Sequence, residues 1–195
     1  MKALKVTGFI LAGGKSSRMG RDKALLDWNG RPLLDHMIAL VGTAATDVQV
    51  VGRDRLPDRW PGRGPLSGIA TALEITLTDE NLVVAVDLPF LTTGFLSYLR
   101  SRFERTNRPL LACKIESHFP LCLGIRRALL PEIQRRVENG NLSMHALIEE
   151  ADSEILSESE LRNAGFESSI FRNINTPEDY AGNSGTEIRG QTPNF

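Results

Sequence analysis

The sequence predicts an α/β fold of three layers, in which helices cover both faces of a mostly parallel β-sheet. Short runs of Val, Ile and Leu alternate along the chain with longer segments whose apolar residues recur every three or four positions. The runs are apolar at consecutive positions, which is typical of strands buried on both faces of a parallel sheet. Such strands require right-handed crossover connections, and the segments between them supply the helices.

The expected elements alternate in order. The expected strands are residues 6–11, 48–51, 82–86, 110–113, 121–125 and 170–174. The expected helices are residues 32–45, 68–77, 94–105, 128–138 and 143–150. A further short helix is expected to start near Pro177, because Thr176 can cap it and Asp179 completes a pattern like a capping box.

Length and composition limit the class of protein. The 195 residues predict a single domain over residues 1–181 and a polar, flexible tail over residues 182–195 that has little to bury. No apolar run approaches the ~20 residues of a membrane helix, and the net charge of −1 gives no general attraction to nucleic acid. Two isolated cysteines, Cys113 and Cys122, favour a cytoplasmic location.

The residues after the first expected strand predict a phosphate-binding site. Ligands of parallel sheets bind beyond the carboxyl ends of the strands. There, Gly13 and Gly14 allow several backbone N–H groups to point at one anion. Three cations follow, and these are Lys15, Arg18 and Lys23. The alternative is a solvated glycine-rich turn, but the position and the density of positive charge favour a di- or triphosphate.

Two standard phosphate-binding motifs do not fit this sequence. A P-loop ending at Gly14 needs a glycine where Phe9 stands. A dinucleotide-binding fingerprint starting at Gly62 needs a glycine where Ser67 stands. A P-loop NTPase is therefore excluded, and a dehydrogenase is disfavoured.

Two further segments can contribute to the same site. The stretch from Gly64 to Gly68 opens a helix, whose first N–H groups can face an anion, although a purely structural turn is the alternative. Asp87 follows the expected strand 82–86 at its carboxyl end. A carboxylate there can hold Mg²⁺ while water and phosphate take the other positions, or it can cap the next turn.

Five sequence blocks occur in a fixed order over residues 6–181. They are LAGGKSSRMGRDKALL (11–26), GPLSG (64–68), VDLP (86–89), HFP (118–120) and NINTPED (173–179). In these blocks the chain resembles the molybdenum cofactor guanylyltransferases, within the wider nucleotidyltransferases of Rossmann-like fold. The resemblance implies a fold like that of the nucleotide-diphosphate-sugar transferases. It also implies transfer of GMP from Mg-GTP to the terminal phosphate of the molybdenum-bearing pterin, with release of pyrophosphate.

The resemblance also implies roles for individual residues. The implied nucleotide contacts are Leu11, Ala12, Gly13, Gly14, Lys23, Asp58, Gly64, Gly68 and Asp87. The implied magnesium ligand is Asp87, and the implied pterin contacts are Asn173 and Asn175. Asp58 is the best match to an aspartate that the family places upstream of GPLSG, and Asp54 is the alternative. An asparagine that some relatives have after the second strand is replaced near Gly52.

The chemistry of this reaction agrees with the residues present. A phosphate oxygen attacking an α-phosphorus brings two anions together, so the protein has mainly to align and neutralise them. The residues expected to be catalytic are Arg18, Lys23 and Asp87. The expected partners are GTP and the molybdenum-pterin cofactor, with proteins of molybdoenzyme maturation as further candidates, whereas nucleic acid and membranes are not expected.

Three alternatives stay open. A cytidylyltransferase for the same pterin typically reads LAAG and DxDTPED, and the Gly13-Gly14 pair and the two asparagines differ from that pattern. Another small-molecule nucleotidyltransferase would share the fold and Asp87. A non-catalytic nucleotide-binding module would bind nucleotide without releasing pyrophosphate.

Overall fold

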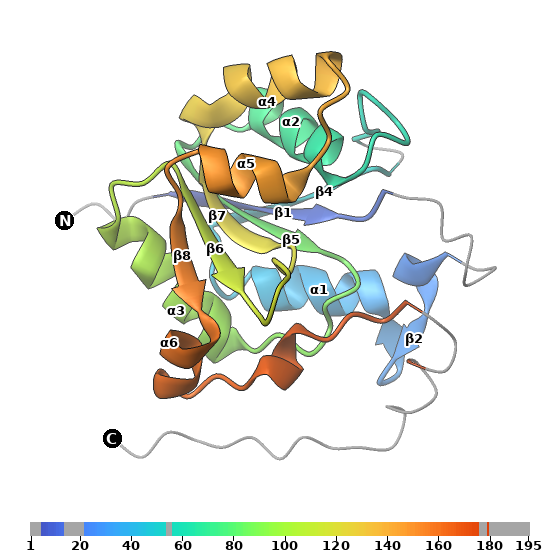
Figure 1. Ribbon diagram of the computed structural model, residues 1–195. Coiled ribbons are helices and arrows are strands. Elements are labelled where there is room, and N and C mark those ends of the chain that lie inside the picture. The colour runs from blue at the N-terminus through green and yellow to red at the C-terminus, as the bar shows by residue number, and fades with distance from the viewer. Residues whose placement is uncertain (1–4, 14–21, 54–55, 176–178, 180–195) are drawn as a thin grey trace.

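A six-stranded sheet lies between two layers of helices in the computed structural model, which describes residues 5–13, 22–53, 56–175 and 179 (Figure 1). The strands are β1 (Val6–Leu11), β4 (Asp47–Val51), β5 (Glu80–Ala85), β6 (Leu110–Lys114), β7 (Cys122–Arg126) and β8 (Glu154–Ser157). Their order in the sheet is β4-β1-β5-β7-β6-β8, and only β7 runs antiparallel to its neighbours. The predicted α/β class with a mostly parallel sheet is confirmed.

The helices divide evenly between the two faces of the sheet (Figure 1). One face is covered by α1 (Leu33–Val41), α3 (Thr93–Arg105) and α6 (Glu158–Asn163). The other face is covered by α2 (Pro65–Ile75), α4 (Leu130–Glu138) and α5 (Met144–Glu150). Shorter elements complete the chain, and these are η1 (Lys23–Leu25), η2 (Arg127–Leu129), η3 (Ser168–Phe171) and a small sheet of β2 (Asp27–Trp28) and β3 (Arg31–Pro32).

Strand β1 shows why the strands are apolar at consecutive positions. Phe9 is buried in the core under α2, α4 and α5, whereas Ile10 is buried in the core under α1 and α3. Gly8 lets α1 approach the sheet closely, because a Cβ at this position would lie 2.4 Å from Cγ1 of Val41. Both faces of the strand are thus covered by helices, as the apolar run predicts.

The register of the parallel strands brings three strand ends to one level. Leu11 is paired with Val51 on β4 and with Ala85 on β5. Beyond this level the backbone pairing continues, because Ala12 N–H donates to the carbonyl of Val51 at 2.9 Å and Val86 N–H donates to that of Leu11 at 3.1 Å. The segments that follow β1, β4 and β5 therefore leave the sheet side by side.

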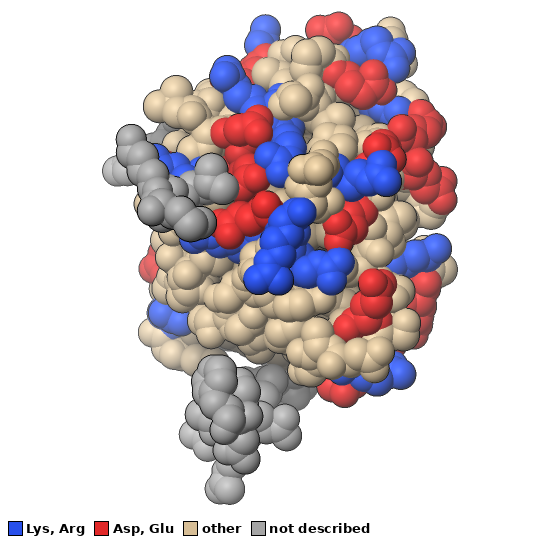
Figure 2. Space-filling model, turned by 90° about the vertical axis from the view of Figure 1, so that its left-hand side faces the viewer, with Lys and Arg blue, Asp and Glu red and all other residues tan. Residues whose placement is uncertain are grey.

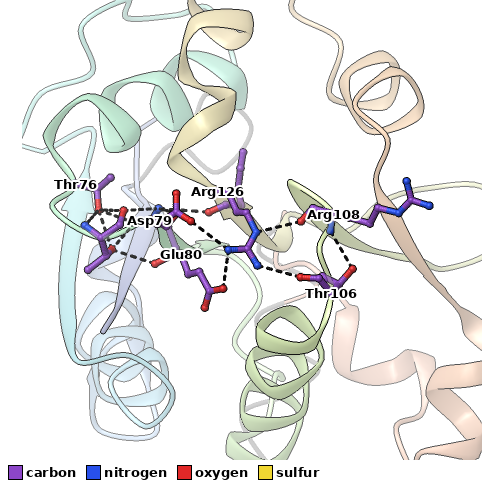
Figure 3. A network of polar contacts seen from close by, with 9 residues as sticks. Thr76, Asp79, Glu80, Thr106, Arg108 and Arg126 are labelled. Carbon is purple, nitrogen blue, oxygen red and sulfur yellow. Dashed lines mark hydrogen bonds and ion pairs between the residues drawn. The ribbon is translucent and has the colours of Figure 1, made fainter. Parts of the chain in front are cut away.

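A polar network connects the chain at the opposite edge of the sheet, which is where β5 starts and β7 ends (Figure 3). Nη1 of Arg126, at the end of β7, lies 2.8 Å from the buried carboxylate of Glu80 and 3.2 Å from that of Asp79. The same guanidinium donates to the carbonyl oxygens of Thr106 at 3.0 Å and Arg108 at 3.4 Å. Arg126 thus joins the end of β7 to the start of β5 and to the chain after α3, and it compensates the buried charge of Glu80.

The prediction of a strand over residues 170–174 is wrong. Residues 168–171 form η3, and residues 172–175 run on outside the sheet. The apolar residues there are buried without being paired in the sheet, since Phe171 packs edge-on against Phe95 with 4.9 Å between ring centroids. The strand next to β6 at the end of the sheet order is β8, which was not predicted because four residues are too few to show a strand pattern.

The five predicted helices are confirmed with shifted ends. Helix α1 ends at Val41, before residue 45, and α2 starts at Pro65, before residue 68. Gly64 precedes α2 with a φ of +74°, a conformation that glycine adopts readily, and proline suits the first helical turn. Helix α6 and the β2–β3 sheet were not predicted. Of the helix expected from Pro177, the structure describes Asp179, which is helical and whose Oδ2 accepts the N–H of Asn175 at 2.9 Å. The tail over 182–195 lies outside the described residues.

The surface seen in Figure 2 carries acidic and basic side chains side by side over most of its area. This face is the left-hand side of Figure 1, where α3 and β8 lie. Among the described residues, none of the helices has the length and apolar character needed to cross a membrane.

Close packing at Gly124 provides a test of this fold. A Cβ at Gly124 on β7 would lie 2.5 Å from Cγ of Phe103, a residue of α3 that is 1% exposed. We expect Gly124→Ala to lower the free energy of unfolding by about 1–3 kcal/mol, measured by urea denaturation. Gly94→Ala in the first turn of α3 is the control, because a Cβ there meets nothing nearer than 3.9 Å. Equal stability of Gly124→Ala and the wild type would contradict this packing.

Candidate active site

A cavity of about 580 Å³ opens where the ends of β1, β4 and β5 converge. Its lining also includes residues of η1, the loop before α2 and the start of α2 itself. This volume is typical of sites for small molecules, and the position agrees with the general rule for parallel sheets.

Most of the residues expected to form the site line this cavity. They are Leu11, Ala12, Gly13, Lys23, Asp58, Gly64, Gly68, Asp87 and Asn173. Asn175 is not among the lining residues, but its side chain contacts Lys23. Gly14, Arg18 and Asp54 lie outside the described residues.

Lys23 joins two segments that are far apart in the sequence. Its Nζ lies 3.2 Å from Oδ2 of Asp87 and 2.8 Å from Oδ1 of Asn175. The side chains of Lys23 and Asp87 are 18% and 19% exposed, so the ion pair is largely shielded from water. The backbone reinforces the contact, since Ile174 N–H donates to the carbonyl of Asp87 at 2.9 Å. The chain after η3 is thereby held beside the end of β5.

The second oxygen of Asp87 is suited to a cation. Oδ1 is buried and accepts no hydrogen bond from any described residue, so the alternative role of Asp87 as a turn cap is not observed. Within the described ranges, no group of three or more His, Cys, Asp or Glu side chains could hold a metal ion. Mg²⁺ commonly binds one or two carboxylates and takes phosphates and waters as its other ligands. One carboxylate therefore fits a metal that arrives with a nucleotide.

The end of β4 touches the end of β1 backbone to backbone. Gly52 has a φ of +89°, and a Cβ on it would lie 2.3 Å from Cα of Gly13. A larger residue at position 52 would thus require the two segments to move apart. Since Gly13 and Gly52 both line the cavity, this part of its wall is built from backbone.

Helix α2 directs its amino terminus into the cavity. Gly64, Pro65 and Gly68 line the cavity, and the helix runs for 11 residues from Pro65. Gly68 allows the helix to lie against β1, because a Cβ there would be 3.3 Å from a methyl group of Leu11. The N-terminal end of a helix carries partial positive charge and unpaired N–H groups, which favour an anion.

Asp58 has a structural role that the sequence did not reveal. Its carboxylate accepts hydrogen bonds from Oγ of Ser67 at 2.7 Å, Oγ1 of Thr71 at 3.3 Å and the backbone N–H of Trp60 at 3.0 Å. Ser67 and Thr71 lie on α2, so Asp58 fastens the preceding loop to that helix. Because it also lines the cavity, Asp58 both shapes the wall and forms part of it.

Asp22 and Arg53 were missed by the sequence analysis. Asp22 lines the cavity, and its Oδ1 accepts a hydrogen bond from Ala24 N–H at 3.1 Å, which caps η1. Both of its oxygens contact the guanidinium of Arg53, and this hydrogen bonding lowers the pKa of the Asp22 carboxyl below its ordinary value. The only sequence signal was an aspartate directly before Lys23, and nothing in the sequence paired it with Arg53.

The loop that follows β5 is supported by aromatic packing. Phe90 meets Trp28 of β2 edge-on with 5.2 Å between ring centroids, and the guanidinium of Arg172 lies 4.4 Å from the centroid of Phe90. Nε2 of His36 lies 3.0 Å from the carbonyl oxygen of Pro89, and burial lowers the pKa of this imidazole. A neutral His36 donates through Nε2 to that carbonyl. These contacts fix the loop against α1 and the β2–β3 sheet.

The role of Asp58 can be tested without any ligand. Asp58→Ala removes the acceptor of Trp60 N–H and breaks the contacts of the loop with Ser67 and Thr71, whose hydroxyls keep the carbonyls of Gly64 and Ser67 as acceptors. We expect the free energy of unfolding to fall by about 1–2 kcal/mol in urea denaturation. The control is Asp47→Ala, since Asp47 is exposed at the start of β4. Unchanged stability of the ligand-free Asp58→Ala protein would show that the carboxylate does not fasten the loop.

Comparison with known proteins identifies the family. The family model described as MobA-like NTP transferase domain matches residues 8–155. A probable molybdenum cofactor guanylyltransferase of Carboxydothermus hydrogenoformans is 30% identical over 184 residues, which cover 90% of this chain and 93% of the relative. A protein of the same description from Deinococcus radiodurans is 33% identical over 193 residues, which cover 93% and 95%.

A solved structure agrees in fold. Molybdopterin-guanine dinucleotide biosynthesis protein A from Archaeoglobus fulgidus superposes with a TM-score of 0.77 over 90% of this chain and 95% of that chain, at 24% identity. This likeness shows the Rossmann-like nucleotidyltransferase fold. The match to the family model and the relatives of similar length confirm the resemblance found in the sequence. The chain belongs to the MobA-like NTP transferases and, within them, to the molybdenum cofactor guanylyltransferases.

Proposed function

We propose that the protein transfers GMP from Mg-GTP to the terminal phosphate of the molybdenum-bearing pterin, releasing pyrophosphate and giving the guanine dinucleotide cofactor. The main support for this proposal is that Lys23 contacts both Asp87 and Asn175. Lys23 lies at the cavity between the ends of β1, β4 and β5. One cation there borders the carboxylate expected on the nucleotide side and the amide expected on the pterin side.

The nucleotide is held by groups from three elements in this proposal. Backbone N–H groups after β1 and at the start of α2 bind the phosphates, and Lys23 adds a positive charge beside them. Asp87 would hold Mg²⁺, since its buried Oδ1 accepts no hydrogen bond from a described residue. When bound, the metal ion neutralises part of the triphosphate charge and fixes its orientation. Arg18 is expected to contribute a further cation.

The acceptor lies toward the chain after η3 in this proposal. Amide groups can both donate and accept, which suits a pterin ring and its phosphate, and Asn173 and Asn175 supply two of them. A phosphate oxygen of the acceptor attacks the α-phosphorus of GTP as the bond to the leaving pyrophosphate breaks. Because this phosphate is already largely ionised near neutral pH, the reaction needs alignment and charge neutralisation but no protein base.

The proposed setting is the cytoplasm. Cys113 and Cys122 are free and buried, and burial raises the pKa of the Cys113 thiol to about 12. Such thiols do not need an oxidising compartment. We also propose that proteins of molybdoenzyme maturation receive the product.

Base preference is tested by supplying the molybdenum-pterin cofactor and measuring pyrophosphate release with GTP, CTP and ATP. We expect kcat/KM to be highest for GTP by about tenfold or more. This expectation rests on the LAGG and NINTPED blocks and on the relatives described as guanylyltransferases. A preference for CTP would contradict the guanylyl assignment, and binding of nucleotide without pyrophosphate release would indicate a non-catalytic module.

The role of Asp87 is tested by Asp87→Asn, which keeps the shape of the side chain but removes its charge. We expect kcat/KM to fall by about a hundredfold or more at limiting Mg²⁺, while the thermal unfolding midpoint stays close to that of the wild type. Asp79→Asn at the opposite edge of the sheet is the control, since Asp79 is 65% exposed and far from the cavity lining. Near-normal turnover of Asp87→Asn at limiting Mg²⁺ would remove Asp87 from the site.

A further inference from the structure

Arg53 lies beside the active site without a role in the reaction as described so far. It follows Gly52 directly at the end of β4. Its Nη1 contacts Oδ2 of Asp22 and its Nη2 contacts Oδ1, so the two side chains meet through two parallel hydrogen bonds. Such bidentate pairs fix orientation as well as distance, because the guanidinium is a planar fork.

The backbone that carries Arg53 is itself held in place. Gly52 packs against the backbone of Gly13, and its N–H donates to the carbonyl of Leu56 at 2.8 Å. Leu56 N–H in turn donates to the carbonyl of Arg53 at 2.9 Å. Arg53 therefore presents its guanidinium from a fixed position relative to the ends of β1 and β4.

Asp22 links the fixed guanidinium of Arg53 to the position of Lys23. Its Oδ1 accepts the N–H of Ala24 at 3.1 Å, so the residue held by Arg53 is also the cap of η1, whose first residue is Lys23. The Nζ of Lys23 then contacts Asp87 on the chain after β5. The contact of Arg53 with Asp22, the peptide bond from Asp22 to Lys23 and the contact of Lys23 with Asp87 thus connect the end of β4, through η1, to the end of β5.

We propose that Arg53 is a positioning residue of the transfer reaction, which fixes Asp22 and thereby sets Lys23 between Asp87 and Asn175. The proposal rests on the function proposed for the same site. A lysine side chain has many rotamers, and holding its backbone at one place reduces the ordering that substrate binding and the transition state require. Arg53 is not among the residues that line the cavity, so in this proposal it acts on the reaction through Lys23.

Kinetics of single and double variants test this route. We expect Arg53→Ala to lower kcat/KM for GTP by about ten- to a hundredfold, chiefly through kcat, because Lys23 is displaced from its place. In a Lys23→Ala background the same change should cost less than about twofold, since the residue on which Arg53 acts is already absent. Arg53→Lys should recover only part of the loss, because it keeps the charge but not the fork.

Two further variants serve as matched controls. Asp22→Asn keeps a side-chain oxygen to cap η1 but loses the paired contact, so it should reproduce the loss of Arg53→Ala, and the double variant should be no worse than either. If Arg53→Ala does not fold, the kcat/KM of Asp22→Asn tests the same proposal. Arg135→Ala removes an arginine that pairs with Glu132 on the surface of α4, away from the cavity lining, and should leave kcat/KM unchanged.

A measurement on the ligand-free protein separates this proposal from the proposed function. Amide hydrogen exchange of Ala24, followed by NMR, should become about tenfold faster in Arg53→Ala, because the Asp22 cap is loosened, and should not change in Arg135→Ala. A wild type that transfers no nucleotide would overturn the proposed function while this measurement still decides the role of Arg53. Unchanged Ala24 exchange, full activity of Arg53→Ala, or an equal loss in the Lys23→Ala background would overturn the positioning role.

Discussion

The parallel pairing of β1 with β4 on one side and β5 on the other is the constraint on which the site depends. Its register sets Leu11 level with both Val51 and Ala85. Three chain segments must therefore leave the sheet at one level and on one edge, where their N–H groups and side chains can face a common ligand. The Arg126 network lies at the other end of these strands, where it joins the start of β5 to the end of β7.

Close backbone packing and polar contacts hold the converging segments in fixed positions. Glycine at positions 13 and 52 lets two of the segments touch, and the Lys23–Asp87 pair joins the first segment to the third. The hydrogen bond from Ile174 N–H to the carbonyl of Asp87 holds a fourth segment, the chain after η3, at the same place. A reaction between two phosphate-bearing substrates needs cations and N–H groups held in fixed positions more than it needs a reactive side chain.

Periodicity predicted the elements that are long and buried, and it failed where elements are short. It found β1 and β5 because both are apolar on both faces, but the four residues of β8 carry no comparable pattern. Among residues 170–174, Phe171 and Ile174 are apolar because they are buried, but this burial comes from the packing of η3 and the residues after it, without pairing in the sheet. The rule that ligands bind at strand ends indicated Gly13 and Asp87. The Arg53–Asp22 pair spans 31 residues and arises only from the tertiary fold, so no local pattern could reveal it.

The central claim is that the segments after β1, β4 and β5 together bind the nucleotide. Chemical-shift mapping by NMR, with a non-hydrolysable GTP analogue and Mg²⁺, tests this claim directly. The account predicts that the largest backbone shifts fall at Ala12, Gly13, Gly52 and Asp87, with little change at Asn81 and Arg126 on the opposite edge. Shifts that concentrate at Asn81 and Arg126, or that omit the ends of β1 and β5, would contradict it.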